Sequence, residues 1–218
     1  MGAITRGIAG NLTTGGVFIA SAINNTSVGS VTSFASVPSG GSLKLLQTQN
    51  ASSSATIDFT SNIDATYKSY MFRFYNIHLA TDGAEFEFQA DTGTNTNYNQ
   101  TITSTYFLAE HTEASGGGTF SYQDSRDQAQ GTAFQHLGVD LGTDADQGCS
   151  GFMQIFEPAS TTFRKDFICQ LQQAHQNDLS LVGYIAGYFN TTTAITRFRF
   201  KASSGNVDSG TIKLYGVS

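Results

Sequence analysis

The sequence predicts an all-β protein: an antiparallel β-sandwich of jelly-roll type with an extended N-terminal arm. First, residues 43–218 contain about ten to twelve short runs of alternating apolar and polar residues, separated by turn residues. Second, the sequence lacks coiled-coil heptads and repeats of about 20–50 residues. Third, charged residues are only 13% of the chain, while 17 Phe and 9 Tyr can fill a core. An uncharged polar surface over an aromatic core suits a rigid β protein.

The first 42 residues differ from the rest of the chain. They contain single apolar residues among Gly, Ser, Thr and Asn, with no sustained period of 2 or 3.6 residues. The turn cluster Val37–Ser42 closes this segment. A free linker would carry fewer bulky apolar residues, so we expect residues 1–42 to form an arm that becomes ordered against a partner. A partly disordered leader is the alternative.

The sandwich is expected to begin with strands over 43–48 and 55–59, followed by the longest run, Tyr70–Leu79. Alternation along this run places two sets of side chains on opposite faces. One face carries Tyr70, Phe72, Phe74 and Asn76, and the other carries Met71, Arg73, Tyr75 and Ile77.

The dipeptide Asp82-Gly83 is a hairpin signal between this run and the next one. In the next run, Phe86 and Phe88 alternate with three polar residues, Glu85, Glu87 and Gln89. We therefore predict a hairpin whose second strand is half-buried and exposes its polar face.

The last of the remaining runs, 211–216, ends close to the carboxyl end, and we expect it to close a sheet edge. Pro158 ends one of the other runs, and the segment 124–134 has room for one helical turn at most. The other predicted strands are 104–111, a short strand after the glycine-rich segment that begins at 113, then 133–142, 149–157, 166–174, 181–189 and 194–202.

The net charge of −6 argues against nucleic acid as a partner, because binding phosphates requires a basic patch. The densest basic run is Arg197, Arg199 and Lys201. These residues alternate with Phe198 and Phe200, so they form the polar face of one strand.

Cys149 and Cys169 are too few for a disulfide framework and lie on separate apolar stretches. We expect buried reduced thiols; a disulfide between neighbouring strands is the alternative, and it would need an oxidising compartment. No run approaches the ~18 apolar residues of a membrane span, and the opening residues lack the apolar block of a signal peptide. We therefore expect assembly in a cytosol and no membrane partner.

No catalytic residue is predicted. The four histidines occur in no zinc-binding pattern, so each is expected on a surface or strand face. Glu85 and Glu87 share one face of a strand, as a glycan-cleaving carboxylate pair would, but an exposed polar face explains them equally well. Glu110 and Glu113 flank a loop.

The segment Asp140–Gly148 is the best candidate for a metal site. Asp140, Asp144 and Asp146 lie close together in sequence, and calcium prefers several oxygen ligands from a short loop. The full calcium-loop pattern is missing, since Phe152 stands where the closing glutamate would be. An acidic turn is the alternative, and no cofactor other than Ca²⁺ is expected.

Four stretches of the chain resemble a family of structural proteins from tailed bacteriophages of mostly marine and cyanobacterial hosts. They are residues 51–89, 144–167 and 186–218 and the opening "MGAITRGIAGNLTTGGVF". Members of this family are described as virion or tail-fibre-like proteins, and the family offers no catalytic residue to map. The resemblance implies a virion component, assembled in the host cytoplasm, whose partners are copies of itself, most simply in a trimer, and other capsid or tail proteins.

The predicted function is that of a non-enzymatic surface subunit of a virion, either a tail-fibre-like appendage or a head-decoration protein. In this hypothesis residues 1–42 attach to the particle and residues 43–218 face outward. The first alternative is a lectin-like module that binds host cell-surface glycans, with Tyr98, Tyr106 and Tyr122 as stacking groups. A glycan-cleaving enzyme is the second alternative.

Overall fold

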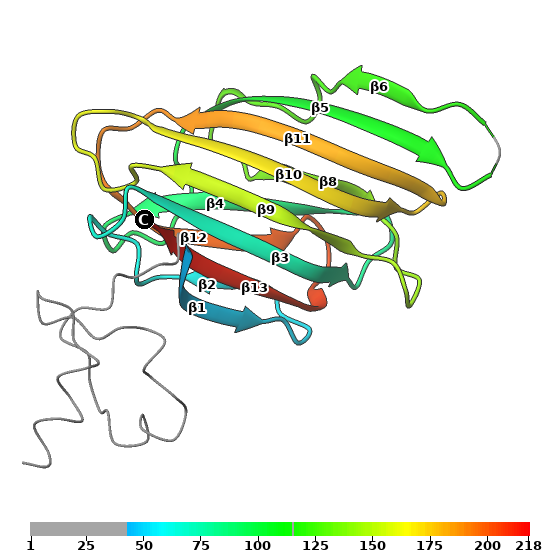
Figure 1. The fold of residues 1–218 in the computed structure, drawn as a ribbon, viewed down its shortest axis with the longest axis horizontal. Coiled ribbons are helices and arrows are strands. Elements are labelled where there is room, and N and C mark those ends of the chain that lie inside the picture. The colour runs from blue at the N-terminus through cyan, green and yellow to red at the C-terminus, as the bar shows by residue number, and fades with distance from the viewer. Residues whose placement is uncertain (1–42, 115) are drawn as a thin grey trace, which may run out of the picture. The chain divides into compact units, whose positions relative to one another are not determined.

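The computed structural model describes residues 43–114 and 116–218, and within these ranges all regular structure is β-strand (Figure 1). The thirteen strands are β1 (Leu43–Asn50), β2 (Ile57–Phe59), β3 (Ser69–Leu79), β4 (Ala84–Thr92), β5 (Ile102–Thr112), β6 (Thr119–Tyr122), β7 (Ala129–Gly131), β8 (Gln135–Leu141), β9 (Cys149–Phe156), β10 (Lys165–His175), β11 (Leu179–Phe189), β12 (Ile195–Ala202) and β13 (Val207–Val217). The predicted arm, residues 1–42, lies outside the described residues.

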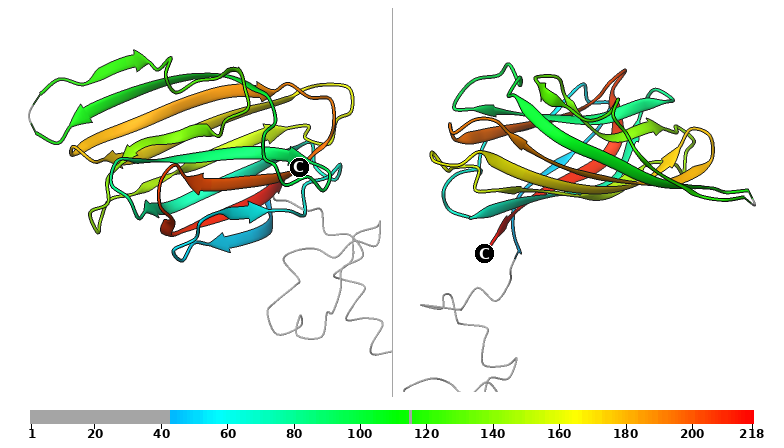
Figure 2. Two further views of the ribbon diagram at one scale, coloured as in Figure 1. Left: turned by 180° about the vertical axis from the view of Figure 1, so that it is seen from behind. Right: turned by 90° about the horizontal axis from the view of Figure 1, so that it is seen from above.

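The strands form two packed layers, which Figure 2 shows from behind and from above. The front layer, which faces the viewer in Figure 1, has the order β1-β13-β3-β9-β10-β11-β5, with β6 and β7 along the far edge of β5. The back layer has the order β8-β4-β12-β2. The layers join at one corner, where His175 of β10 pairs with Leu141 of β8. Every named strand pairing is antiparallel, so the prediction of an antiparallel β-sandwich is confirmed.

An aromatic core fills the space between the layers. Phe200 of β12 lies at its centre and is fully buried. Its ring centroid is 5.1–6.2 Å from those of five other phenylalanines, namely Phe59, Phe72, Phe74, Phe86 and Phe88. These contacts join β2, β3, β4 and β12, so the core ties the two layers together.

The predicted alternation holds in the first half of β3 and fails at Asn76. Phe72 and Phe74 are buried as expected, but Ile77, predicted to share the outer face with Tyr75, is also fully buried. Asn76 has a φ of +47°, and the register with β9 shifts between Phe74 and Ile77. A β-bulge therefore inserts one residue and exchanges the faces beyond it, which a strict period of 2 does not anticipate.

The predicted hairpin at Asp82-Gly83 is wrong, although the turn itself is present. Gly83 has a φ of +70°, and the Ala84 N–H donates to the Thr81 carbonyl at 3.1 Å. However, β3 pairs with β13 and β9, while β4 pairs with β12 and β8. The turn thus carries the chain from the front layer to the back layer, since turn residues specify the reversal and not the strand partners.

The last strand, β13, does not form an edge of the front layer. β13 lies between β1 and β3, so β1 forms the edge that the last strand was expected to close. The single turn expected within 124–134 is present, since the Arg126 and Asp127 N–H groups both donate to the Gln123 carbonyl.

Both cysteines are free and buried on neighbouring strands, which confirms the expectation of reduced thiols. Burial raises the pKa of the Cys149 and Cys169 thiols well above the usual range. Among the described residues no helix is long and apolar enough to cross a membrane.

Candidate functional site

Three features of the described residues have the chemistry of a functional site: a charge cluster on the back layer, and an aromatic patch and a polar groove on the front layer. The charge cluster consists of Glu85, Glu87, Arg126, His136, Asp140 and Lys201. Its carboxylates come from β4 and β8. The pairing of β4 with β12 and β8 brings residues that are far apart in the sequence side by side.

Strand register assembles the centre of the charge cluster. Lys201 of β12 and His136 of β8 are the direct neighbours of Glu87 on β4. Lys201 Nζ lies 2.9 Å from Glu87 Oε2, and His136 Nε2 lies 3.5 Å from Glu87 Oε1. On the other side of the imidazole, His136 Nδ1 lies 2.5 Å from Glu85 Oε2. The two glutamates face the same side of β4, as their spacing predicted.

Arg126 completes the charge cluster from the turn that precedes β7. Its guanidinium forms an ion pair with Glu85 and lies 3.0 Å from Asp140 Oδ2. Asp140 has a φ of +49° and also lies 3.9 Å from His175 Nε2. Sequence reasoning missed this assembly because no local pattern links a turn, two strands and their register.

The polar face of β4 is covered, so the prediction that it would be exposed is wrong. Glu87, Gln89 and Asp91 are all less than 10% exposed. The Gln89 amide donates to the carbonyls of Gln100, Thr132 and Ala133 at 2.9–3.3 Å. The connections that hold these carbonyls cross the outer face of β4, which alternation within the strand cannot reveal.

Glu85, Glu87 and His136 offer ligand atoms that lie within 4.8 Å of one another, so their geometry would suit a metal ion. Burial lowers the pKa of His136, an effect that Arg126 and Lys201 strengthen and that Glu87 and Asp140 oppose. Both glutamates are already paired with a cation, and a metal would have to displace Arg126 and Lys201. The arrangement is therefore that of a closed ion-pair network that fixes the back layer.

The predicted calcium ligands are not gathered in one place. Asp140 belongs to the charge cluster, while Asp144 and Asp146 lie exposed in the connection between β8 and β9. Among the described residues, only Glu85, Glu87 and His136 form a group of three such side chains within metal-binding reach of one another. Asp140 is instead paired with Arg126, whose guanidinium lies 3.0 Å from Asp140 Oδ2.

The aromatic patch lies on the outer face of the front layer and consists of Phe107, Phe120, Tyr122, Phe152, Ile168 and Tyr184. Phe107 stacks on Tyr184 with centroids 5.3 Å apart, and Phe120 adjoins Phe107 at 5.4 Å. Phe107, Phe152, Ile168 and Tyr184 help to line a depression of about 230 Å³. Among the described residues that line it, none is charged.

The tyrosines proposed to stack on sugars are mostly inaccessible. Tyr98 and Tyr106 are buried, and only Tyr122 is exposed. The Arg199 guanidinium lies 4.1 Å from the Tyr98 ring, while its Nε and one terminal nitrogen reach the Asp58 carboxylate at 2.7 and 2.6 Å. Tyr98 thus helps to cover the back layer, and two residues of the basic run of β12, Arg199 and Lys201, are paired with carboxylates.

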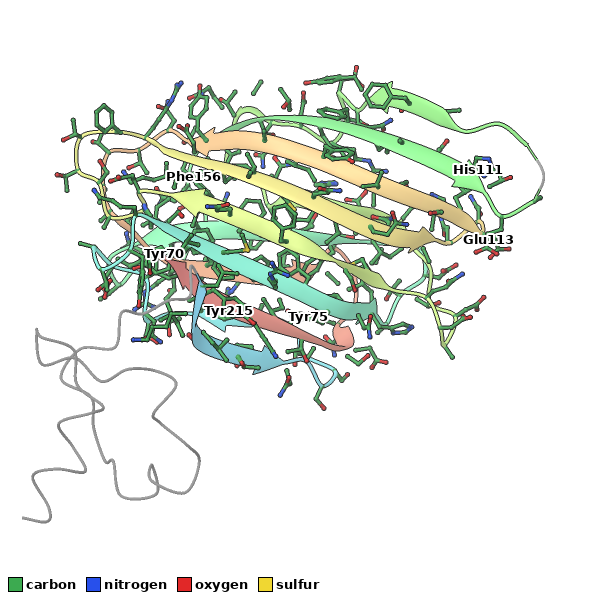
Figure 3. The ribbon with its side chains drawn as sticks, viewed as in Figure 1. Tyr70, Tyr75, His111, Glu113, Phe156 and Tyr215 are labelled. Atoms are coloured by element: carbon green, nitrogen blue, oxygen red, sulfur yellow. The ribbon has the colours of Figure 1, made fainter. Side chains whose placement is uncertain are left out.

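The polar groove is a hollow of about 880 Å³ and lies where β3, β10, β11 and β13 meet the connection between β8 and β9. Its polar side chains include the amides of Asn76, Gln147 and Gln172 and the carboxylates of Glu113, Asp146 and Asp208. In Figure 3, Glu113 lies just beyond the end of β5, beside the turn that joins β10 to β11. Among the lining residues that the structure describes there is no lysine or arginine.

No known protein family, curated protein or solved structure matched the chain. The resemblance to phage structural proteins therefore stays a prediction.

Proposed function

We propose that the protein is a non-enzymatic structural subunit on the surface of a tailed-phage virion. It associates there with copies of itself, as a trimer, and with neighbouring capsid or tail proteins. It is assembled in the host cytoplasm, and the aromatic patch carries its contacts with other copies. The resemblance in the sequence supports the phage setting, and the aromatic patch supports association.

The composition of the aromatic patch supports a protein interface. Phe120 is 71% exposed, and Tyr122, Ile168 and Tyr184 are also exposed. Exposed apolar side chains gathered in one place are costly in water, and aromatic residues are enriched at protein interfaces. Because the depression has no charged lining residue, covering it with another copy would not bring like charges together inside it.

The state of the reactive groups supports a non-enzymatic role. Glu85 and Glu87, the carboxylates with the spacing of a glycosidase pair, are both held in ion pairs with cations. The thiols of Cys149 and Cys169 are buried, and their raised pKa keeps them in the unreactive thiol form.

Incorporation into particles tests this proposal. Tagged full-length chain would be expressed in the host during infection, and purified particles would be probed for the tag. Ile168→Lys places a charge in the aromatic patch, while Phe163→Lys places one at a residue that is 70% exposed outside it. We expect particles to contain the wild-type chain and Phe163→Lys but little Ile168→Lys. Particles that lack the wild-type chain, or that take up all three equally, would contradict the proposal.

A further inference from the structure

The polar groove has features of a binding site that the proposed virion role does not use. Its volume of about 880 Å³ is within the range of small-ligand sites, roughly 300–1,000 Å³. Five separate parts of the chain converge on it: β3, the residue Glu113 after β5, the connection between β8 and β9, the hairpin of β10 and β11, and β13. A site built from segments so distant in sequence is positioned by the fold as a whole.

The backbone beneath the groove departs from regular strand geometry at two facing positions. Asn76, in the β3 bulge, has a φ of +47°, and Gly210 of β13 has a φ of +117°. A Cβ on Gly210 would come within 2.6 Å of the Asn76 carbonyl oxygen, so the close approach of the two strands requires glycine there. Bulges and left-handed residues are frequent beside binding sites because they redirect side chains.

The bulge brings the Asn76 side chain to the groove, where it contacts β9. The Asn76 N–H donates to Ser150 Oγ at 2.9 Å, and Ser150 Oγ lies 3.3 Å from Asn76 Oδ1. Gln172 of β10 donates to Ser180 Oγ on β11 at 2.9 Å. These bonds hold the amides and hydroxyls of four strands in fixed positions along the groove, with further donor and acceptor capacity left for a ligand.

The charges of the groove select among ligands. Glu113, Asp146 and Asp208 are acidic, and His78, 3.7 Å from Asp208, is the one lining side chain of the described residues that can carry a positive charge. Phosphate, sulfate and uronate groups would be repelled. A neutral sugar suits this lining, because each hydroxyl both donates and accepts, and so do the surrounding amides and serines.

We propose that the polar groove binds a neutral oligosaccharide. The carboxylates of Glu113 and Asp146 accept bonds from sugar hydroxyls, while the amides of Asn76 and Gln172 exchange bonds with neighbouring hydroxyls. This places glycan recognition in the groove and not at Tyr98 and Tyr106, which are buried. A basic peptide could pair with the carboxylates of the groove. Its backbone carbonyl oxygens, however, would compete with one another for the few amide donors of the groove.

The test uses the full-length chain on a printed array of neutral and anionic oligosaccharides that also carries a lysine-rich peptide. The double variant Asp146→Ala/Gln172→Ala removes one carboxylate and one amide from the groove. Asp144→Ala is the matched control, because Asp144 is an exposed aspartate of the same connection that does not line the groove.

We expect the wild-type chain and Asp144→Ala to bind neutral glycans equally and the double variant to bind them about tenfold more weakly. Binding confined to anionic glycans or to the peptide would overturn the inference, as would no binding of neutral glycans at millimolar concentration. The oligomeric state of the same samples tests the virion proposal separately. The glycan-binding proposal and the virion proposal can therefore fail independently.

Discussion

The two outer faces of the sandwich share one core but differ in what they offer to solvent. The outer face of the back layer carries Arg199, Lys201, Glu85 and Glu87, and each of them is paired. The outer face of the front layer carries Phe120, Tyr184 and the amides of the polar groove, which remain accessible. The difference shows that the charged side chains of a strand face can be covered and paired, while aromatic side chains on the opposite face are exposed to solvent.

Long connections cause this difference. The segment 93–101 and the residues on either side of β7, 123–128 and 132–134, bring Gln100, Arg126 and Ala133 onto the outer face of β4. The front layer has no comparable cover over β9, β10 and β11 among the described residues, so its outward side chains face solvent (Figure 3). Function is therefore expected on the front layer, and stability should depend on the core and the back layer.

The largest expected effect comes from the core that both layers share. Phe200→Ala removes the ring that contacts five phenylalanines, and we expect it to lower the free energy of unfolding by about 3–5 kcal/mol. Urea denaturation of the full chain measures this. Phe163→Ala, at an exposed position, should cost less than about 0.5 kcal/mol, and an equal loss in both variants would refute the assigned core.

The next effect concerns the back layer. Glu87→Ala leaves Lys201 and His136 without their shared carboxylate in a mostly covered site, and we expect a loss of about 3 kcal/mol. Glu157→Ala is the control, because the Glu157–Lys68 pair is exposed and should contribute less than about 1 kcal/mol. Denaturation measures both losses of unfolding free energy. Similar losses for Glu87→Ala and Glu157→Ala would contradict the view that the outer face of the back layer is covered.

The charge cluster also predicts a pH dependence. The pKa of His136 is lowered in the folded chain, so below the ordinary value of 6.5 the unfolded chain takes up a proton before the folded chain does. The free energy of unfolding should therefore fall between about pH 7.5 and about pH 5.5, and His136→Gln should flatten this part of the profile. His111→Gln, at an exposed position, serves as control. If the unfolding free energy of His136→Gln fell with pH as steeply as that of the wild type, the charge cluster would be excluded as the source of this pH dependence.

The smallest effect on stability is expected on the front layer. Tyr184→Ser removes a ring that stacks on Phe107 but is 37% exposed, so the unfolding free energy should change by less than about 1 kcal/mol. A loss comparable with that of Phe200→Ala would mean that the aromatic patch is part of the core and not a surface for partners.

Much of the fold could be predicted from the sequence because alternation and turn residues are local signals. The strands and the buried phenylalanines of β3, β4 and β12 follow from them. The bulge at Asn76 and the change of layer after Gly83 could not be predicted, since both depend on which strands become partners. The candidate sites were missed for the same reason: Arg126 meets Glu85, and Asn76 meets Ser150, only after the layers have formed.

Sedimentation equilibrium of the full-length chain at micromolar concentration tests most directly whether the open face of the front layer joins copies. We expect the wild-type chain and Phe163→Lys to have about three times the 23.3 kDa mass of one chain, and Ile168→Lys to sediment as a folded monomer. A monomeric wild-type chain, or an Ile168→Lys variant with the same mass as the wild type, would contradict the account.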